Sequence, residues 1–514
     1  MEPQPQVIAG VLGGRSRSRL SHVPSPQAMQ AYRSVVAPPC ALWSPGNPIR
    51  RLPRFMGHRS GPACLTARPP GTAHRSWFCV TTHRARPART VRAMVHQGGP
   101  GAAARADDTT HHDDVLDEAR TVDLTDPRLY ATDRPERIWR TFRRAGVPVR
   151  SPGLRDHWAI TRHAQIREIL KHSHLLSSAK GNHLGEKATD VAAGEAAGGM
   201  SLLVSDGPVH AAMRRVLGAA FTPKLMHRLT ASTEELARQL VSQAAAEPSV
   251  DFVQSVAAPL PAAVICDMLG VPASDRDHVI RLTQAAFGGS GHVTSGNQMA
   301  AHTELFVYCA ELIAAKRRRP GEDVATVLAT AEIDGRPMSR EMAVMNCHDL
   351  IAGGNETARH TSSAAAVTMV TEPAFWRDVR GGQADMATAT DELLRHETPV
   401  NHMMRVLLGD IEIAGVTMRR GEFVTFWVRS ANRDEDVFDD PDEMRATRRP
   451  NPHLGFGFGA HYCIAAMLAR IEVGAIVRAL AEVVGHAELV APPVRLESNF
   501  FRGYRSVRIA LRHR

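Results

Sequence analysis

Residues 339–371 form the longest helical pattern of the chain, SREMAVMNCHDLIAGGNETARHTSSAAAVTMVT. Ser339 can cap its N-terminus, Glu341 lies in the first turn, and Pro373 follows its end. At about 1.5 Å per residue such a helix is roughly 50 Å long, enough to cross a whole domain. The pattern therefore predicts a mainly helical fold built around one long central helix.

The middle of this helix breaks the rules for a buried helix. Gly353 and Gly354 are adjacent, and each costs roughly 1 kcal/mol against Ala in a helix interior. Glu356 and Thr357 follow, where a core helix should be apolar. Local rules broken inside an element indicate a functional site. The alternative is a solvent-facing stretch of a shorter helix.

A second unusual segment is the loop FGFGAHYCIAA, residues 456–466. Gly457 and Gly459 allow its backbone to approach a cofactor closely. A helix that starts after Cys463 presents N–H groups to the sulfur and favours a thiolate. His461 can donate to an anionic group of a flat cofactor. Thiolate ligation of heme iron fits this setting; a nucleophilic cysteine and a structural thiol remain alternatives.

Several other segments accompany this loop in a characteristic order, and the chain resembles the cytochrome P450 family of heme-thiolate monooxygenases in its soluble bacterial form. The resemblance runs from about residue 120 to the C-terminus. Phe456, Gly459, His461 and Cys463 match the heme-ligand signature, and GGNET resembles the oxygen-binding kink of the family's long helix.

The other matching segments carry charged residues. DELLRHETPVNHMMR contains the Glu-x-x-Arg pair, Glu392 and Arg395, followed by Arg405 at the usual place for a propionate contact. DGPVHAAMRR resembles the family's His-x-x-x-Arg, with His210 and Arg214 one helical turn apart. The segments ANRDEDVF and DPDEMRATRRPNPH match the family's meander and supply Arg448.

The resemblance implies a role for each of these residues. Cys463 is expected to bind the iron of heme b as its axial ligand. The heme contacts are expected from His210, Arg214, Arg405, Phe456, Gly459, His461 and Cys463. Glu356 and Thr357 form the acid–alcohol pair expected to deliver protons to bound O2. Glu392, Arg395 and Arg448 are expected to form a buried ion-pair network that is structural rather than catalytic.

The family also implies an α+β fold, mainly helical with small sheets, whose long helix crosses over the heme. It implies electrons from NAD(P)H through a ferredoxin and a ferredoxin reductase. Arg445, Arg448 and Arg449 form a basic group near the ligand loop that either docks an acidic ferredoxin or is ordinary surface charge.

Several positions depart from the family pattern. Ala465 stands where Gly is usual, Ala358 replaces a second hydroxyl residue, and Gly353 replaces the usual Ala. Met444 and Ala446 replace the common Phe and Pro of the meander. None of these changes removes a group that the chemistry needs.

The substrate is expected to be an apolar small molecule or a secondary metabolite tethered to a carrier protein, as in antibiotic biosynthesis. NHMMRV and VTFWVRSANRDED resemble relatives that hydroxylate carrier-bound amino acids; a polyketide, a macrolide or a terpenoid is equally admissible. The reaction is expected to be hydroxylation or epoxidation. The alternative is a protein of this fold with a non-hydroxylating oxidation or a binding role.

Variable segments are expected to select the substrate. Residues 177–206 read as a long loop that roofs the pocket, and residues 285–297 as a mobile lid with glycine hinges. Leu350, Ile351 and Gly354 of the long helix are expected to form the opposite wall.

Charge is distributed unevenly along the chain. Residues 1–105 hold 15 of the 62 Lys and Arg residues and one of the 53 acids; the rest, with 47 basic and 52 acidic residues, carries −5. We interpret residues 1–105 as a disordered extension, a targeting peptide, a basic arm, or the product of a start before the true one at Met94. Residues 106–514 then form a single domain, and a nucleic-acid partner is not expected.

The cysteines and the hydropathy complete the sequence-based expectations. Seven cysteines without a CxxC pair are typical of a reducing cytoplasm. No run of about 18 apolar residues occurs, so no membrane span is expected. Residues 134–146 and 230–247 read as amphipathic helices, and residues 410–428 as a β-hairpin region.

Overall fold

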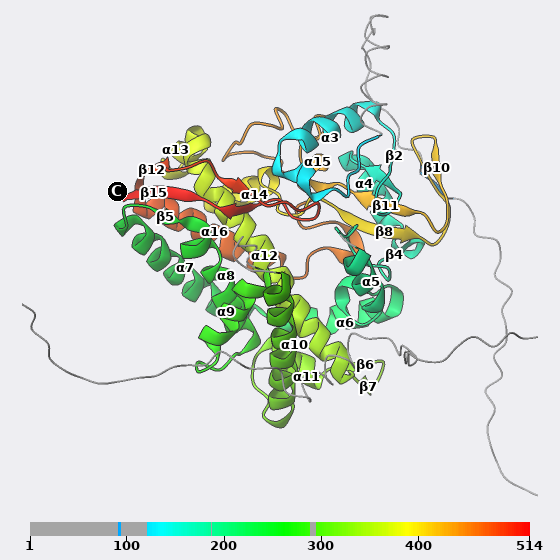
Figure 1. Ribbon diagram of the computed structural model, residues 1–514, viewed down its shortest axis with the longest axis horizontal. Helices are drawn as coiled ribbons and strands as arrows, with labels where there is room; N and C mark the ends of the chain where they lie inside the picture. The colour runs from blue at the N-terminus through cyan, green and yellow to red at the C-terminus, as the bar shows by residue number, and fades with distance from the viewer. Residues whose placement is uncertain (1–90, 94–120, 187, 288–294) are drawn as a thin grey trace, which may run out of the picture.

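A computed structural model describes residues 91–93, 121–186, 188–287 and 295–514. Helices α7–α11 gather on one side of the molecule and a five-stranded sheet lies on the other, with helix α12 running between them (Figure 1). Every helix among the described residues is too short or too polar to span a lipid bilayer. The fold is α+β and mainly helical, as predicted.

Helix α12, Arg340–Thr371, confirms the predicted long helix. The Ser339 side chain accepts a hydrogen bond from the Met342 amide, which caps the first turn. The helix packs against α8, Pro259–Leu269, α10, Ser295–Arg318, and α16, Ala466–Val483. This central position explains why many of its residues are buried on several sides.

The other helices surround α12 or flank the sheet. They are α3 Arg134–Ala145, α4 His163–Lys171, α5 Ala188–Ala196, α6 Gly207–Ala220, α7 Pro223–Ala246, α9 Arg276–Phe287, α11 Val324–Thr330, α13 Pro373–Arg380, α14 Met386–His396 and α15 Val428–Ala431.

The largest sheet has the strand order β2-β3-β11-β8-β4. Its strands are β2 Val149–Ser151, β3 His157–Ile160, β11 Phe423–Phe426, β8 Met403–Leu407 and β4 Leu176–Ser177. Strands β3 and β11 are parallel, and the other neighbours are antiparallel. Arg405 lies in β8 of this sheet. The pairing of β4 with β8 fixes where the segment after Ser177 begins.

The smaller sheets have two or three strands. One joins β9 Ile411–Ile413 to β10 Val416–Met418 and β1 Val91–Ala93; a second joins β12 Val484–Leu489, β15 Arg508–His513 and β5 Val250–Asp251. The pairs are β13 Val494–Arg495 with β14 Tyr504–Ser506, and β6 Glu332–Ile333 with β7 Arg336–Pro337. The β9–β10 pair confirms the predicted hairpin.

Two large core clusters meet at α12. One lies among α6, α8, α10 and α11 and includes Cys347 and Ile351 of α12. The other lies among α7, α14, α16 and β15 and includes Ala365 and Val367 of α12. Burial of apolar side chains on both sides, at about 25 cal/mol per Å², holds this helix in place.

Some predicted boundaries were wrong. Helix α7 begins at Pro223, where Thr222 caps the Leu225 amide, and not near residue 230. The segment 177–206 is not a plain loop, because it contains α5. Most of the segment 285–297 and of residues 1–105 lies outside the described residues. The boundary at residue 105 therefore stays a prediction, although β1 pairs with β9 in the described structure.

Candidate heme-thiolate site

The loop before α16 is shaped by glycine. Gly457 and Gly459 have φ angles of 73° and 75°, in the left-handed region that favours glycine. A Cβ on Gly459 would lie 2.8 Å from the Leu170 carbonyl oxygen, so no larger residue fits without a shift. The Cys463 amide donates to the Phe456 carbonyl at 2.9 Å. These constraints set the direction of the cysteine side chain.

Cys463 is half-buried, and its protein environment opposes ionisation of the thiol. Burial raises its pKa, while a hydrogen bond from the Ala465 amide and the charges of Arg214 and Arg470 counteract this effect. A metal cation bound at the sulfur would keep such a thiol deprotonated. The setting therefore suits a metal-bound thiolate better than a free nucleophile.

A group of basic side chains lies close to this loop. The rings of His210 and His461 are 4.0 Å apart, and the buried His210 Nε2 has no hydrogen-bond partner. Arg405 is 4% exposed, and its Nη1 donates to the Met404 carbonyl at 2.6 Å. Burial lowers the pKa of Arg405 to about 10 and, with the charges of His461 and Arg214, that of His210 to about 4.

Asp206, at the N-cap of α6, is the carboxylate that faces this group. It accepts from the Ser177 hydroxyl at 2.7 Å and lies 3.8 Å from His461 Nε2. Burial raises its pKa, but hydrogen bonds from His461, Ser177 and Ser178 outweigh burial and lower it well below its usual range.

The charges of these side chains can be compared with the two negative charges of the heme propionates. With neutral histidines, Arg214 and Arg405 carry two positive charges and Asp206 one negative charge. A buried guanidinium such as that of Arg405, and a ring nitrogen without a partner such as His210 Nε2, suit anionic carboxylates. The two propionates of heme b supply such groups, and Cys463 supplies the thiolate. The donor set therefore fits heme.

On α12, Thr357 Oγ1 donates to the Gly353 carbonyl at 2.8 Å. Helix α12 is α-helical throughout this stretch, so the expected kink is not a break in the helix. Gly353 is exposed, and a Cβ built on it would meet nothing within 4 Å. Gly353 and the partly exposed Thr357 therefore mark an open face of this central helix.

Glu356 is 5% exposed, and its carboxylate contacts two residues that were not predicted as its partners. Its Oε2 lies 2.6 Å from Arg359 Nη2 and 3.4 Å from His360 Nε2. Burial and the charge of Arg359 lower the pKa of His360, against the effect of Glu356. Arg359 and His360 follow Glu356 by three and four residues. This helical spacing is the feature of the sequence from which both contacts could have been predicted.

The three residues expected to wall the pocket lie on the core side of α12. Ile351 is 1% exposed and belongs to a core cluster, against which Leu350 also packs. A Cβ on Gly354 would lie 2.4 Å from the Ile265 side chain of α8. Adjacent residues are rotated by about 100° around a helix, so Gly353 faces open space while Gly354 faces the core.

The Glu392 carboxylate lies at the centre of a buried network. It accepts from Arg395 Nε and Nη2 at 2.7 and 2.8 Å, and from Arg448 Nε at 3.0 Å. The Arg445 amide donates to it at 2.9 Å. The side chains of Glu392 and Arg395 are fully buried, and that of Arg448 is 6% exposed.

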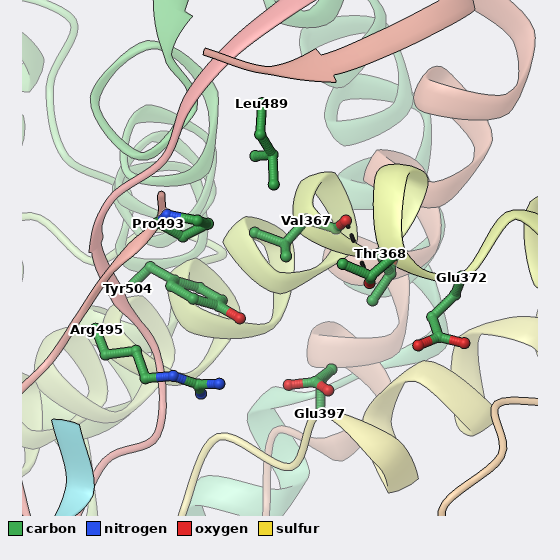
Figure 2. A pocket seen from close by; sticks show the side chains of 9 residues that line it. Val367, Thr368, Glu372, Glu397, Leu489, Pro493, Arg495 and Tyr504 are labelled. Carbon is green, nitrogen blue, oxygen red and sulfur yellow. Dashed lines mark hydrogen bonds between the residues drawn. The ribbon is translucent and has the colours of Figure 1, made fainter. Parts of the chain in front are cut away.

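A separate cavity of about 300 Å³ lies at the C-terminal end of α12 (Figure 2). Its lining includes Thr368, Glu372, Glu397 and Tyr504. Thr368 follows Thr357 by eleven residues, which is roughly 16 Å along the helix axis. None of the predicted site residues lines this cavity. We therefore place the candidate reaction site by Cys463 and the basic group, and not here.

Comparisons with known proteins identify the family of the chain. Residues 386–482 match the family model described as Cytochrome P450. The chain is 33% identical over 402 residues to "Cytochrome P450 NovI" of Streptomyces niveus, covering 77% of this chain and 97% of the relative. It is also 33% identical over 399 residues to "Linalool 8-monooxygenase" of Pseudomonas putida, covering 76% of this chain and 98% of that protein.

A solved structure shows the same fold. The crystal structure of P450 OxyD, described as involved in the biosynthesis of vancomycin-type antibiotics, matches with a TM-score of 0.71 and 33% identity. The match covers 77% of this chain and 100% of OxyD. The chain therefore belongs to the cytochrome P450 family and is a heme monooxygenase that uses O2 and electrons supplied from NAD(P)H through redox partners.

Proposed function

We propose that Cys463 is the axial ligand of heme b and that His210, Arg214, Arg405 and His461 hold its propionates. The observation that carries this proposal is the convergence of desolvated basic groups beside a thiol on a glycine-shaped loop. Phe456 and Gly459 shape the loop, through the Phe456 carbonyl that accepts from the Cys463 amide and through the positive φ angle of Gly459. These roles join residues that are more than 200 positions apart in the chain.

The chain's own residues then position the substrate and move protons. Bound heme supplies the oxidising chemistry that inserts one atom of O2 into a C–H bond or a double bond. The Thr357 hydroxyl, on the open face of α12, holds a water or donates a proton there. Glu356 exchanges protons with His360, to which it is already close, and with solvent when its contact with Arg359 opens.

The Glu392, Arg395 and Arg448 network has a structural role in this proposal. It ties α14 to the meander, since Arg395 also donates to the Asn432, Pro441 and Glu443 carbonyls. The meander leads directly into the Cys463 loop. The network therefore holds the ligand loop in position without touching the substrate.

The substrate proposal is a secondary metabolite, either free or bound to a carrier protein. Its support is the similarity to NovI and OxyD, and to the crystal structure of P450BioI in complex with hexadec-9Z-enoic acid ligated Acyl Carrier Protein, at 25% identity and a TM-score of 0.66. The similarity to "Linalool 8-monooxygenase" supports a terpenoid as the second candidate.

A ferredoxin and its reductase are the proposed redox partners. The basic group considered for docking is a poor candidate in this structure. Arg448 is buried in the network, Arg445 pairs with Asp440 and Glu443, and Arg449 pairs with Asp385. These contacts neutralise the charges that would steer an acidic partner.

The visible spectrum of the reduced protein with carbon monoxide tests the proposed ligand. Thiolate ligation by Cys463 gives a strongly red-shifted Soret band. In Cys463→Ser, this band is expected to disappear, whereas the matched variant Cys266→Ser, at a buried thiol in α8, keeps it. A red-shifted band that persists in Cys463→Ser would contradict the assignment.

The substrate class is tested by the spin-state shift of the oxidised protein. Free amino acids, the same amino acids loaded on a carrier protein, and linalool are titrated in parallel. A shift with the loaded carrier alone supports a tethered substrate. A shift with linalool alone supports the terpenoid candidate.

A further inference from the structure

The open face of α12 also carries an acidic side chain. Asp349, Gly353 and Thr357 follow at intervals of four residues, so they lie along one side of the helix. The Asp349 side chain is 23% exposed, Thr357 is partly exposed, and Gly353 borders open space. Asp349 therefore lies about 12 Å along the helix from the hydroxyl-bearing residue Thr357.

Asp349 has no strong cationic partner among the residues that the structure describes. In the part of the chain that the structure describes, no Lys or Arg comes within 4.0 Å of its carboxylate. The nearest basic atom is His348 Nδ1, 3.7 Å from Oδ1, which is beyond hydrogen-bond distance. A half-buried carboxylate without a partner is costly, and a bound cation would offset that cost.

Aromatic rings from helices α9 and α10 surround His348, the neighbour of this carboxylate on α12. Its ring stacks on Phe306 with centroids 3.8 Å apart and an angle of 8°. His302 lies 5.7 Å and Phe287 6.0 Å from it, and these two rings meet edge to face at 4.7 Å. All three neighbouring rings are partly exposed. The cluster joins α9 and α10 to α12 at His348, next to the open face that carries Asp349.

His302 and His348 both offer polar ring nitrogens to a ligand beside Asp349. His348 is 8% exposed, and neither of its ring nitrogens has a hydrogen-bond partner. Burial, followed by the charge of His348, lowers the pKa of His302 to about 4, so His302 is neutral at pH 7. Phenyl faces, a neutral imidazole and one carboxylate are the surroundings that attract an organic cation.

We propose that Asp349 and the ring cluster of Phe287, His302, Phe306 and His348 bind a positively charged nitrogen of the substrate. This inference rests on the proposed function, because it places the cluster at the substrate side of α12. It narrows the substrate class to molecules with a basic nitrogen remote from the oxidised carbon. A fully apolar terpene would leave Asp349 unpaired and desolvated.

A quaternary ammonium probe tests this proposal without binding the iron, since its nitrogen has no lone pair. Octyltrimethylammonium and octanol are titrated into the heme-loaded full chain, with calorimetry as the readout besides the Soret spin-state shift. The proteins are the wild type, Asp349→Asn, which keeps the shape, and Asp349→Glu, which keeps the charge. Glu341→Gln, an exposed carboxylate in the first turn of α12, is the matched control.

The dissociation constant of the cation is expected to rise at least about tenfold in Asp349→Asn, while that of octanol changes less than about twofold. Asp349→Glu is expected to recover part of the loss, and Glu341→Gln to behave as the wild type. Equal effects on both probes, or no binding of the cation to the wild type, would overturn the proposal. The carbon monoxide band of every variant is recorded as well. If the band stays red-shifted, the heme site is intact, and a negative binding result then counts against the cation site alone.

Discussion

Replacement of Glu392 by Gln is the sharpest test of how the ligand loop is held. Gln has nearly the same shape but no charge, and its amide group would place donors against donors. Arg395 and Arg448 would then remain buried, with exposures of 0% and 8%, without their carboxylate. Burial already lowers the pKa of Arg395 although Glu392 raises it, which shows that desolvation dominates there.

The magnitude follows from the burial of this network. Removing one partner from a buried ion pair costs about 3–5 kcal/mol, because an uncompensated charge remains. That energy corresponds to roughly two to four orders of magnitude in the unfolding equilibrium constant. We expect Glu392→Gln to fold poorly or to lose heme, since its charge no longer joins α14 to the meander before the Cys463 loop.

The assay is guanidinium chloride unfolding followed by far-UV circular dichroism, with the carbon monoxide band recorded on the same samples. Glu443→Gln is the matched control, because its side chain is 65% exposed and pairs with the surface residue Arg445. We expect no measurable loss in this control. A Glu392→Gln protein as stable as Glu443→Gln, with an intact red-shifted band, would refute the reasoning.

Other predictions concern single positions. Gly353→Ala should raise the unfolding free energy by about 1 kcal/mol in thermal unfolding, because Gly353 borders open space. Gly354→Ala should gain less, since its methyl group would meet Ile265; equal gains would contradict the assigned faces of α12. Burial lowers the pKa of His157 to about 4, so the unfolded state binds more protons between pH 6.5 and 4, and stability falls as the pH falls through this window. His157→Asn should therefore reduce the pH slope of the unfolding free energy there by about 1.4 kcal/mol per pH unit, and an unchanged slope would exclude His157 as its source. Arg405→Gln should speed the loss of heme to apomyoglobin at least about tenfold, and an unchanged rate would remove Arg405 from the propionate contacts.

Elements with strong local signals could be predicted from the sequence. The caps and breakers around α12 are local, because Ser339 and Pro373 act on neighbouring residues of the backbone. The hairpin β9–β10 follows from alternation and from Ala414 and Gly415, which both adopt positive φ angles. The start of α7 was misplaced because Thr222 and Pro223 form a stronger start than the later Ser and Thr residues.

The resemblance to a known family supplied contacts that no local pattern contains. Glu392 and Arg448 are 56 residues apart, and His210 and His461 are 251 residues apart, yet both pairs meet. The partners Asp206, Arg359 and His360 were not foreseen. Asp206 meets His461 through the fold alone, whereas the spacing of Arg359 and His360 from Glu356 was visible in the sequence.

The sequence by itself determined the long helix, the glycine-shaped cysteine loop and the chemistry that one thiol in such a loop can support. The tertiary structure decided which side of the long helix is open and which side packs against the core. Helix α12 carries apolar and small residues almost all round, so its own pattern does not separate Gly353 from Gly354. The packing of Gly354 against Ile265 of α8 separates the two glycines. A helix turns by about 100° per residue, so only one of two adjacent glycines can face the core.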